Sequence, residues 1–280
     1  MLLLAFAFSA LLLVACGGNA TATTTPTPTA TVTATGTPTA APVTGKITVF
    51  AASSLTESFK AIGAAFQKAN PGAPVEFNFG ASSALEAQIA QVAPADVFAS
   101  ADTANMQKSV EKGLIAGTPV TFARNLPVIV VPADNRASIA TPKDLAKPGT
   151  KIVLAGPEVP IGAYARQIVD KLAADASYGA AFKDATLKNV VSNEANVRAV
   201  LTKIELGEAD AGVVYKTDAL VSGTKVKTIA VPDAANVIAT YPIAVVKASK
   251  SADAAAAFVK FVTGAEGQAA LKAAGFDPAQ

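Results

Sequence analysis

The chain has 280 residues, enough for one large domain or two ordinary ones, and 51% of them are hydrophobic, which excludes disorder over most of the length. Lysine and arginine exceed aspartate and glutamate by only two, 23 against 21, so the basic face of a nucleic-acid-binding protein is not expected. The chain has no histidine and one cysteine, Cys16, which excludes a histidine-based catalytic triad, an internal disulfide and a zinc cluster.

An almost unbroken apolar run, from Leu2 to Ala15, lies at the N-terminus. It has the length of the hydrophobic region of a signal peptide and is shorter than a membrane span. The run ends in the letters LVAC, which resemble the bacterial lipobox, whose cysteine is acylated and becomes the mature N-terminus. We predict a lipoprotein signal peptide over 1–16 and an extracytoplasmic protein anchored to the cell membrane by lipid on Cys16. The alternative is an ordinary signal peptide that happens to contain a cysteine.

A segment rich in threonine, proline and alanine follows over 17–44 and carries no charged side chain. Such a composition cannot bury enough apolar surface to offset the entropy lost on ordering. Repeated prolines favour extended conformations, so the segment could span on the order of 80 Å when stretched. We predict a disordered tether between the lipid and a folded body.

The predicted folded body begins near Gly45 with strands and helices in alternation. Period-two patterns of β-branched and aromatic residues predict strands over 46–50, 74–79 and 96–100. Apolar residues at helical spacing predict helices between and after them, over 54–69, 82–91 and 102–112. This order favours a parallel sheet with helices on both faces.

A second α/β unit is predicted from the same patterns. Its strands are expected over 128–132, 151–155, 187–192 and 211–215, and its helices over 161–174 and 195–206. A return strand over 239–247 and two helices over 251–263 and 265–274 complete the chain, with Gly264 as the cap between the helices.

These units predict an α/β fold with two lobes, each a mainly parallel sheet flanked by helices, joined by crossing strands. We assign 45–122 together with 241–280 to lobe 1, and 123–240 to lobe 2. The cleft between two such lobes is a common place for a ligand.

Helix starts that follow predicted strands carry the candidate binding groups. Ser54 follows the first strand, Ser82 follows the second, and the turn GPEVPIG over 156–162 follows the strand at 151–155. In open α/β sheets ligands bind beyond the carboxyl ends of the strands, and helix N-termini bind anions through unpaired N–H groups. Each serine could instead be an ordinary helix N-cap. An anion site requires these helix starts to converge.

Five stretches of the chain resemble the molybdate-binding proteins of bacterial ABC importers. In order they are KITVFAASSLT at 46–56, APADVFASAD at 93–102, PEVPIGAYA at 157–165, GVVYKTDA at 212–219 and YPIAVV at 241–246. The resemblance covers 45–276 and implies a two-lobed periplasmic-binding-protein-like fold. It also implies binding of molybdate, or the similar tungstate, with no cofactor and no catalytic activity.

The resemblance implies a set of ligand contacts, which are Ser54, Ser82, Ile161, Val197 and Tyr215. Ser83 is the alternative to Ser82, one residue further on. Ile161 stands where familiar members of the family have alanine, which a contact through the backbone N–H tolerates. Molybdenum would be bound through its oxygens, with no direct metal ligand from the protein.

The implied donors are neutral, which suits an oxyanion with two charges. Hydroxyl, phenol and backbone N–H groups form strong charge-assisted hydrogen bonds without desolvating a lysine or arginine. Sites that contain only donors also reject protonated anions. Arg198 and Lys216 are expected to be surface residues or salt-bridge partners rather than counter-charges. Asp96 and Asp102 are expected to be structural caps.

Other functions remain open on the residues alone. Another oxyanion such as sulfate or phosphate is the main alternative ligand, and a structural surface lipoprotein is a further one. A serine-dependent hydrolase is a remote alternative, because Ser109 and Lys112 match Ser-x-x-Lys without its supporting motifs. The chain has no Walker A motif, so as a transport protein it would serve a separate ABC permease and ATPase. We expect the binding protein itself to be a monomer.

Overall fold

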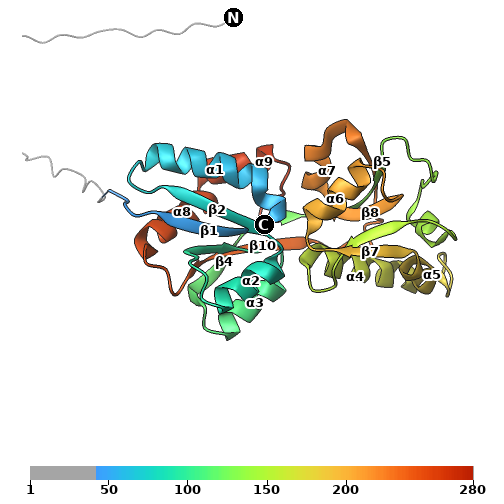
Figure 1. Cartoon of the computed structure of the whole chain (residues 1–280), viewed down its shortest axis with the longest axis horizontal. Coiled ribbons are helices and arrows are strands. Elements are labelled where there is room, and N and C mark those ends of the chain that lie inside the picture. The colour runs from blue at the N-terminus through green and yellow to red at the C-terminus, as the bar shows by residue number, and fades with distance from the viewer. Residues whose placement is uncertain (1–41, 280) are drawn as a thin grey trace, which may run out of the picture. The chain divides into compact units, whose positions relative to one another are not determined.

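The computed structural model describes residues 42–279, and these residues form one compact unit. The predicted signal peptide, the lipidation site Cys16 and nearly all of the predicted tether lie outside the described residues. Two sheets, each with helices on both faces, make up the compact unit (Figure 1). We call the parts built on the first and second sheets lobe 1 and lobe 2.

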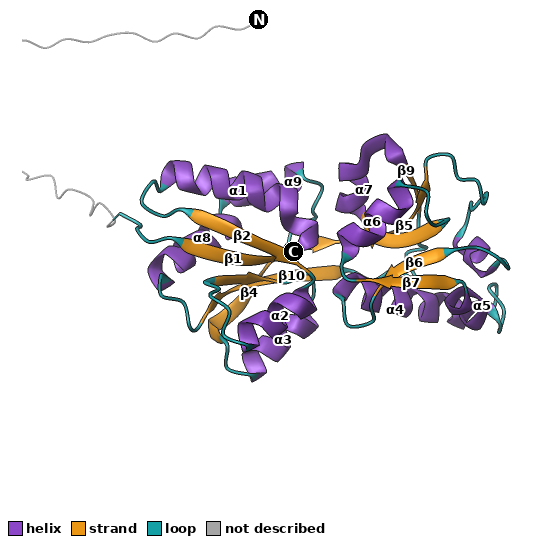
Figure 2. Ribbon diagram, in the orientation of Figure 1, coloured by secondary structure: helices purple, strands orange, loops and turns teal. Residues whose placement is uncertain are grey.

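Lobe 1 contains a five-stranded sheet in the order β2-β1-β3-β10-β4. Helices α1, α8 and α9 pack on one face of this sheet, and α2 and α3 on the other (Figures 1 and 2). The strands are β1 (Ile47–Ala52), β2 (Val75–Gly80), β3 (Val97–Ala99), β4 (Ile115–Asn125) and β10 (Ala239–Val246). The helices are α1 (Thr56–Ala69), α2 (Ser82–Ala90), α3 (Thr103–Glu111), α8 (Ala252–Thr263) and α9 (Ala265–Ala273).

Lobe 2 contains a second five-stranded sheet, in the order β7-β6-β8-β5-β9. Helices α4 and α5 pack together along one side of the sheet, and α6 and α7 along the other (Figure 2). The strands are β5 (Pro127–Pro132), β6 (Ile152–Ala155), β7 (Val190–Glu194), β8 (Ala211–Tyr215) and β9 (Val226–Ile229). The helices are α4 (Pro160–Ala174), α5 (Phe182–Lys188), α6 (Val197–Glu205) and α7 (Lys216–Ser222), with short 3-10 turns at Pro142–Ala146 and Gly223–Lys225. A further 3-10 turn, Ser53–Leu55, lies between β1 and α1 in lobe 1.

Both sheets are mixed, which refines the expectation of mainly parallel sheets. In lobe 1, β1 pairs in parallel with β2 and β3, whereas β10 is antiparallel to β3 and β4. In lobe 2, β6 is parallel to β7 and β8, whereas β5 is antiparallel to β8 and β9. The strands in antiparallel pairs include the four that flank the crossings between the lobes, β4 and β5 at one crossing and β9 and β10 at the other. The single residue Leu126 separates β4 from β5, and 230–238 connect β9 to β10.

The core of lobe 1 forms where the apolar stripe of α1 meets the sheet. Phe59, Ile62 and Phe66 recur at helical spacing and are almost completely buried. Phe59 and Phe66 both make edge-to-face contacts with Phe258 of α8, with ring centroids 6.1 and 5.3 Å apart. Such aromatic pairs hold α1, and therefore the turn that precedes it, in a fixed position on the sheet.

Several elements differ from those predicted. The long strand β4 was not predicted, because Gly117 and Pro119 interrupt its pattern, and antiparallel pairing with β10 stabilises it instead. The strand predicted over 187–192 is wrong at its start, because helix α5 extends to Lys188 and β7 begins at Val190. Helices α5 and α7 and strand β9 were also not predicted. No helix of the described chain is both long and apolar enough to cross a membrane.

Candidate functional site

A small cavity lies where the two lobes meet. The empty space in it is about 190 Å³ even when its opening to solvent is included. A single small ion suits this space better than a sugar or a peptide. The lining residues are Ala52, Ser53, Ser54, Gly80, Ala81, Ser82 and Ala101 from lobe 1, and Val159, Pro160, Ile161, Val197 and Tyr215 from lobe 2.

The structure brings all five sequence-predicted contacts to this one cavity. They come from five different elements: the turn before α1, the start of α2, the start of α4, the start of α6 and the end of β8. Ser83, the alternative to Ser82, is not among the lining residues. The convergence that the sequence could not establish is therefore present, and the role of each residue in binding an anion is a proposal.

Neither Ser54 nor Ser82 serves as the N-cap of the helix that follows it. The N-cap positions of α1 and α2 are Leu55 and Ala81, and neither makes a side-chain capping bond. The Ser82 Oγ instead accepts a hydrogen bond from the N–H of Ala101, 2.9 Å away. The Ser54 Oγ lies 3.0 Å from the Tyr241 hydroxyl. The ordinary capping alternative is thus wrong for both residues, and both hydroxyls lie at the cavity.

Two helix starts in lobe 2 contribute backbone donors. Asn196 caps α6 and accepts from the N–H groups of Arg198 and Ala199, at 2.9 and 3.0 Å, but not from that of Val197. In α4, Pro160 occupies the first position, so Ile161 carries the first N–H of that helix. The first N–H groups of a helix have no partner within it and attract anions. Both suit a ligand in the cavity.

Tyr215 supplies a buried hydroxyl with no partner. Its oxygen makes no hydrogen bond to any other described residue, although the side chain is only 1% exposed. Burial raises the pKa of this phenol well above its usual value, so it remains a hydrogen-bond donor at every physiological pH. An unsatisfied buried hydroxyl is costly, and a bound acceptor would remove that cost.

The lining of the cavity is neutral throughout, since none of its residues carries a charge. Elsewhere in residues 42–279, no cluster of three or more histidine, cysteine, aspartate or glutamate side chains is arranged to hold a metal ion. The arrangement therefore offers hydroxyl and N–H donors to an acceptor-rich ligand. Asp96 and Asp102 have the structural roles expected of them: Asp96 accepts from the Thr48 N–H, and Asp102 caps α3.

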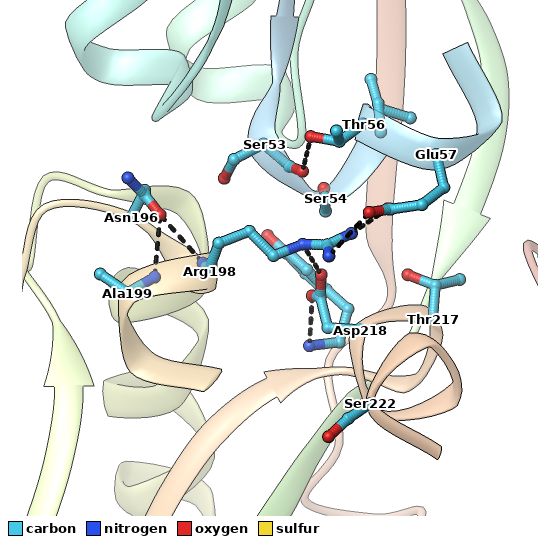
Figure 3. Close-up of polar contacts among 12 residues, drawn as sticks. Ser53, Ser54, Thr56, Glu57, Asn196, Arg198, Ala199, Thr217, Asp218 and Ser222 are labelled. Carbon is cyan, nitrogen blue, oxygen red and sulfur yellow. Dashed lines mark hydrogen bonds and ion pairs between the residues drawn. The ribbon is translucent and has the colours of Figure 1, made fainter. Parts of the chain in front are cut away.

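A charged cluster next to the cavity joins the lobes (Figure 3). Arg198 of lobe 2 lies between Glu57 of α1 and Asp218 of α7, and it forms ion pairs with both. Its Nε is 2.8 Å from the Asp218 Oδ1, although the N–H does not point along that line. Asp218 also accepts from the Tyr215 N–H at 3.1 Å, so this cluster holds the end of β8. Arg198 is thus a salt-bridge partner, as expected.

A second set of polar contacts joins the lobes beyond the first. The Lys216 Nζ lies 2.8 Å from the Asp277 Oδ1 near the C-terminus, and Asn125 of β4 donates to the Thr217 Oγ1 at 2.8 Å. The rings of Tyr215 and Tyr241 also meet edge to face across the boundary, with centroids 5.7 Å apart. These contacts and the Arg198 cluster describe lobes closed over the cavity.

Asp218 makes folding pH-dependent. Burial raises its pKa to about 6 from an ordinary 3.8, and Arg198 only partly opposes this effect. Because the pKa of Asp218 is higher in the folded than in the unfolded state, its ionisation lowers the free energy of unfolding. This loss of stability is complete above pH 6 and disappears as the pH falls toward 3.8. Asp218→Asn removes this cost. We expect the unfolding free energy of the wild type, relative to this variant, to fall by about 2–3 kcal/mol between pH 4 and 7.

Urea unfolding of both proteins at pH 4, 5, 6 and 7 checks this prediction. Asparagine can still accept from the Tyr215 N–H, so the helix start is preserved. A stability difference that does not vary with pH would show that Asp218 does not titrate in this range.

Sequence reasoning missed three residues around the site: Glu57, Asp218 and Tyr241. Glu57 and Asp218 stand three residues after Ser54 and Tyr215, on the first turns of the helices that follow, and that spacing was an available signal. Tyr241 lies within the stretch YPIAVV, but nothing in the sequence places it next to Ser54, 187 positions away.

Comparisons with known proteins agree with this geometry. A family model described as bacterial extracellular solute-binding protein matches residues 47–277. The molybdate-binding protein ModA of Mycobacterium tuberculosis is 41% identical over 266 residues, which cover 94% of this chain and 92% of the relative. A putative ABC transporter substrate-binding lipoprotein of Bacillus subtilis is 34% identical over 236 residues, covering 82% and 85%.

A solved structure resembles the chain as well. The substrate-binding domain of a putative molybdenum ABC transporter from Clostridium difficile is 31% identical, with a TM-score of 0.62, and the match covers 84% of this chain and 99% of that one. The chain belongs to the bacterial extracellular solute-binding protein family.

Proposed function

We propose that this protein binds molybdate, and the similar tungstate, for delivery to an ABC importer. The observation that carries the proposal is the convergence of neutral donors on one small cavity, among them the buried Tyr215 hydroxyl, which has no hydrogen-bond partner within residues 42–279. The molybdate-binding relative at 41% identity supports the same ligand.

The donor set suits a doubly charged tetrahedral oxyanion. Donors reach the cavity from both lobes. They are the hydroxyls of Ser54, Ser82 and Tyr215 and the backbone N–H groups of Ile161 and Val197. Hydrogen bonds to a charged acceptor are roughly twice as strong as neutral ones, and no lysine or arginine has to lose its hydration to form them. Sulfate and phosphate present the same tetrahedral oxygens, so another such oxyanion is the alternative ligand.

The rest of the transport role follows from the family. Delivery requires a separate permease and ATPase, and we propose these as partners of a monomeric binding protein without enzymatic activity or cofactor. The lipid on Cys16 would hold it at the outer surface of the membrane, which the lipoprotein relative from Bacillus subtilis supports.

Calorimetric titration of the purified protein with molybdate, tungstate, sulfate and phosphate tests the function. We expect molybdate and tungstate to bind with similar affinity, and sulfate and phosphate to bind much more weakly. Sulfate or phosphate binding as tightly as molybdate would transfer the proposal to the alternative ligand.

Removal of one donor tests the site. We expect Ser54→Ala, Ser82→Ala and Tyr215→Phe each to weaken molybdate binding by about 10- to 100-fold, the loss of one hydrogen bond to a charged group. Ser83→Ala is the matched control, because Ser83 follows Ser82 but does not line the cavity, and it should change the affinity less than twofold. If Ser83→Ala has the larger effect, the assignment of Ser82 is wrong.

A further inference from the structure

Ser82 and Ser54 each have a hydrogen-bonding group next to the hydroxyl oxygen. The Ala101 N–H can only donate, so the Ser82 Oγ must accept from it, at 2.9 Å. The hydroxyl hydrogen of Ser82 is then free to point elsewhere. Among the hydrogen bonds of the described chain, Ser82 has no other side-chain partner. A ligand in the cavity is the acceptor that this hydrogen lacks.

The corresponding group behind Ser54 is the Tyr241 hydroxyl, 3.0 Å from the Ser54 Oγ. By distance alone either oxygen could be the donor. Tyr241 is completely buried, and burial raises its pKa well above the usual value, so its hydroxyl keeps its hydrogen. Among residues 42–279, Ser54 is the partner at hydrogen-bonding distance, and the side-chain amide of Asn125 also acts on this hydroxyl, as a donor that lowers the pKa of Tyr241.

A count of hydrogens decides the direction once an anion is bound. Tyr241 and Ser54 bring two hydroxyl hydrogens, Asn125 brings a donor amide, and the acceptors for the two hydroxyls are each other's oxygen and the anion. If Ser54 donated to Tyr241, the phenol hydrogen would be buried without a partner. Only the order Tyr241 to Ser54 to anion satisfies both hydrogens. A hydroxyl that accepts a hydrogen bond is also a better donor.

We propose that Tyr241 is a positioning residue that fixes Ser54 as a donor to the bound oxyanion and thereby disfavours protonated oxyanions. The proposal rests on the proposed function. Without Tyr241, the Ser54 hydroxyl could turn and accept from an acidic ligand, such as hydrogen phosphate. With Tyr241 and the Ala101 N–H both in place, the two serines face the cavity as donors.

A double-mutant cycle tests whether Tyr241 acts through Ser54. We expect Tyr241→Phe to raise the Kd for molybdate by about 3- to 10-fold, which corresponds to the loss of one neutral hydrogen bond. We also expect it to lower the ratio of the phosphate Kd to the molybdate Kd. In the Ser54→Ala background the same change should alter the Kd less than twofold. Phenylalanine keeps the ring packed against Phe122 and Phe276, and thermal unfolding without ligand checks that each variant folds.

Tyr164→Phe is the matched control, because it removes a phenol hydroxyl from a residue that packs against Tyr215 but does not itself line the cavity. It should leave the molybdate Kd and the selectivity ratio unchanged. Equal losses from Tyr241→Phe in both backgrounds, or no loss in either, would overturn the positioning role. A wild-type protein that binds neither molybdate nor tungstate would overturn the proposed function itself, and the positioning role with it.

Discussion

Arg198→Met is expected to lower the free energy of unfolding by about 3–5 kcal/mol at pH 7.5, the typical cost of removing one partner from a buried ion pair. The reason is Asp218, which is fully buried and ionised at that pH and has Arg198 as its positive partner. At pH 5 the cost should be much smaller, because Asp218, with a pKa of about 6, is then protonated. Chemical unfolding at both values of pH measures the difference.

Two control variants test whether the lost stability comes from the unpaired Asp218 carboxylate rather than from the removal of an arginine in general. Arg136→Met breaks an exposed ion pair with Asp134, whose side chains are 88% and 51% exposed, and should cost less than about 1 kcal/mol. Combining Arg198→Met with Asp218→Asn should restore most of the lost stability at pH 7.5. A cost that is the same at pH 5 and pH 7.5 would mean that lost packing of the arginine, and not an unpaired carboxylate, explains the result.

Gly162→Ala is expected to destabilise the protein by about 3 kcal/mol and to weaken ligand binding. A Cβ at this position would lie 2.0 Å from the Gly156 carbonyl oxygen and 2.4 Å from that of Ala155. Both clashing atoms belong to the backbone, so the start of α4 must move away from β6. Overpacking of this kind destabilises a protein by up to about 3 kcal/mol. That movement displaces Ile161, which lines the cavity.

The control is Gly264→Ala, where the nearest atom to the new Cβ, the Lys260 carbonyl oxygen, is 3.1 Å away. This change should cost far less and leave the ligand affinity unaltered. Thermal unfolding and calorimetric titration of both variants make the comparison. A Gly162→Ala protein that matches the wild type in both measurements would show that α4 can shift without disturbing the site.

The sequence predicted the elements with strong local patterns and missed those that depend on distant partners. Strand β8 was predicted with its correct bounds, and helix α1 to within its 3-10 turn, because apolar periodicity and a clear start define them. Strand β4 contains Gly117 and Pro119, and only its long pairing with β10 makes it a strand. The mixed character of the sheets depends on the same pairings.

The site divides in the same way. Serines at helix starts after strands suggested an anion site, and the resemblance to molybdate-binding proteins selected the five residues that the structure brings to one cavity. The contacts that support the site could not be predicted from the sequence. The Ser54–Tyr241 hydrogen bond joins positions 187 residues apart, and the Glu57–Arg198 ion pair joins positions 141 residues apart. Such pairs depend on how the lobes close, which no local pattern encodes.

The division of the donors between the lobes sets how the ion can leave. Ser54 and Ser82 belong to lobe 1, whereas Ile161, Val197 and Tyr215 belong to lobe 2. A small rotation that parts the lobes leaves each half with too few donors to replace the hydration of a dianion. In the proposed transport role, an importer would not need to bind the ion more tightly than this site does, because separating the lobes, and with them the Arg198–Glu57 and Lys216–Asp277 ion pairs, would release it.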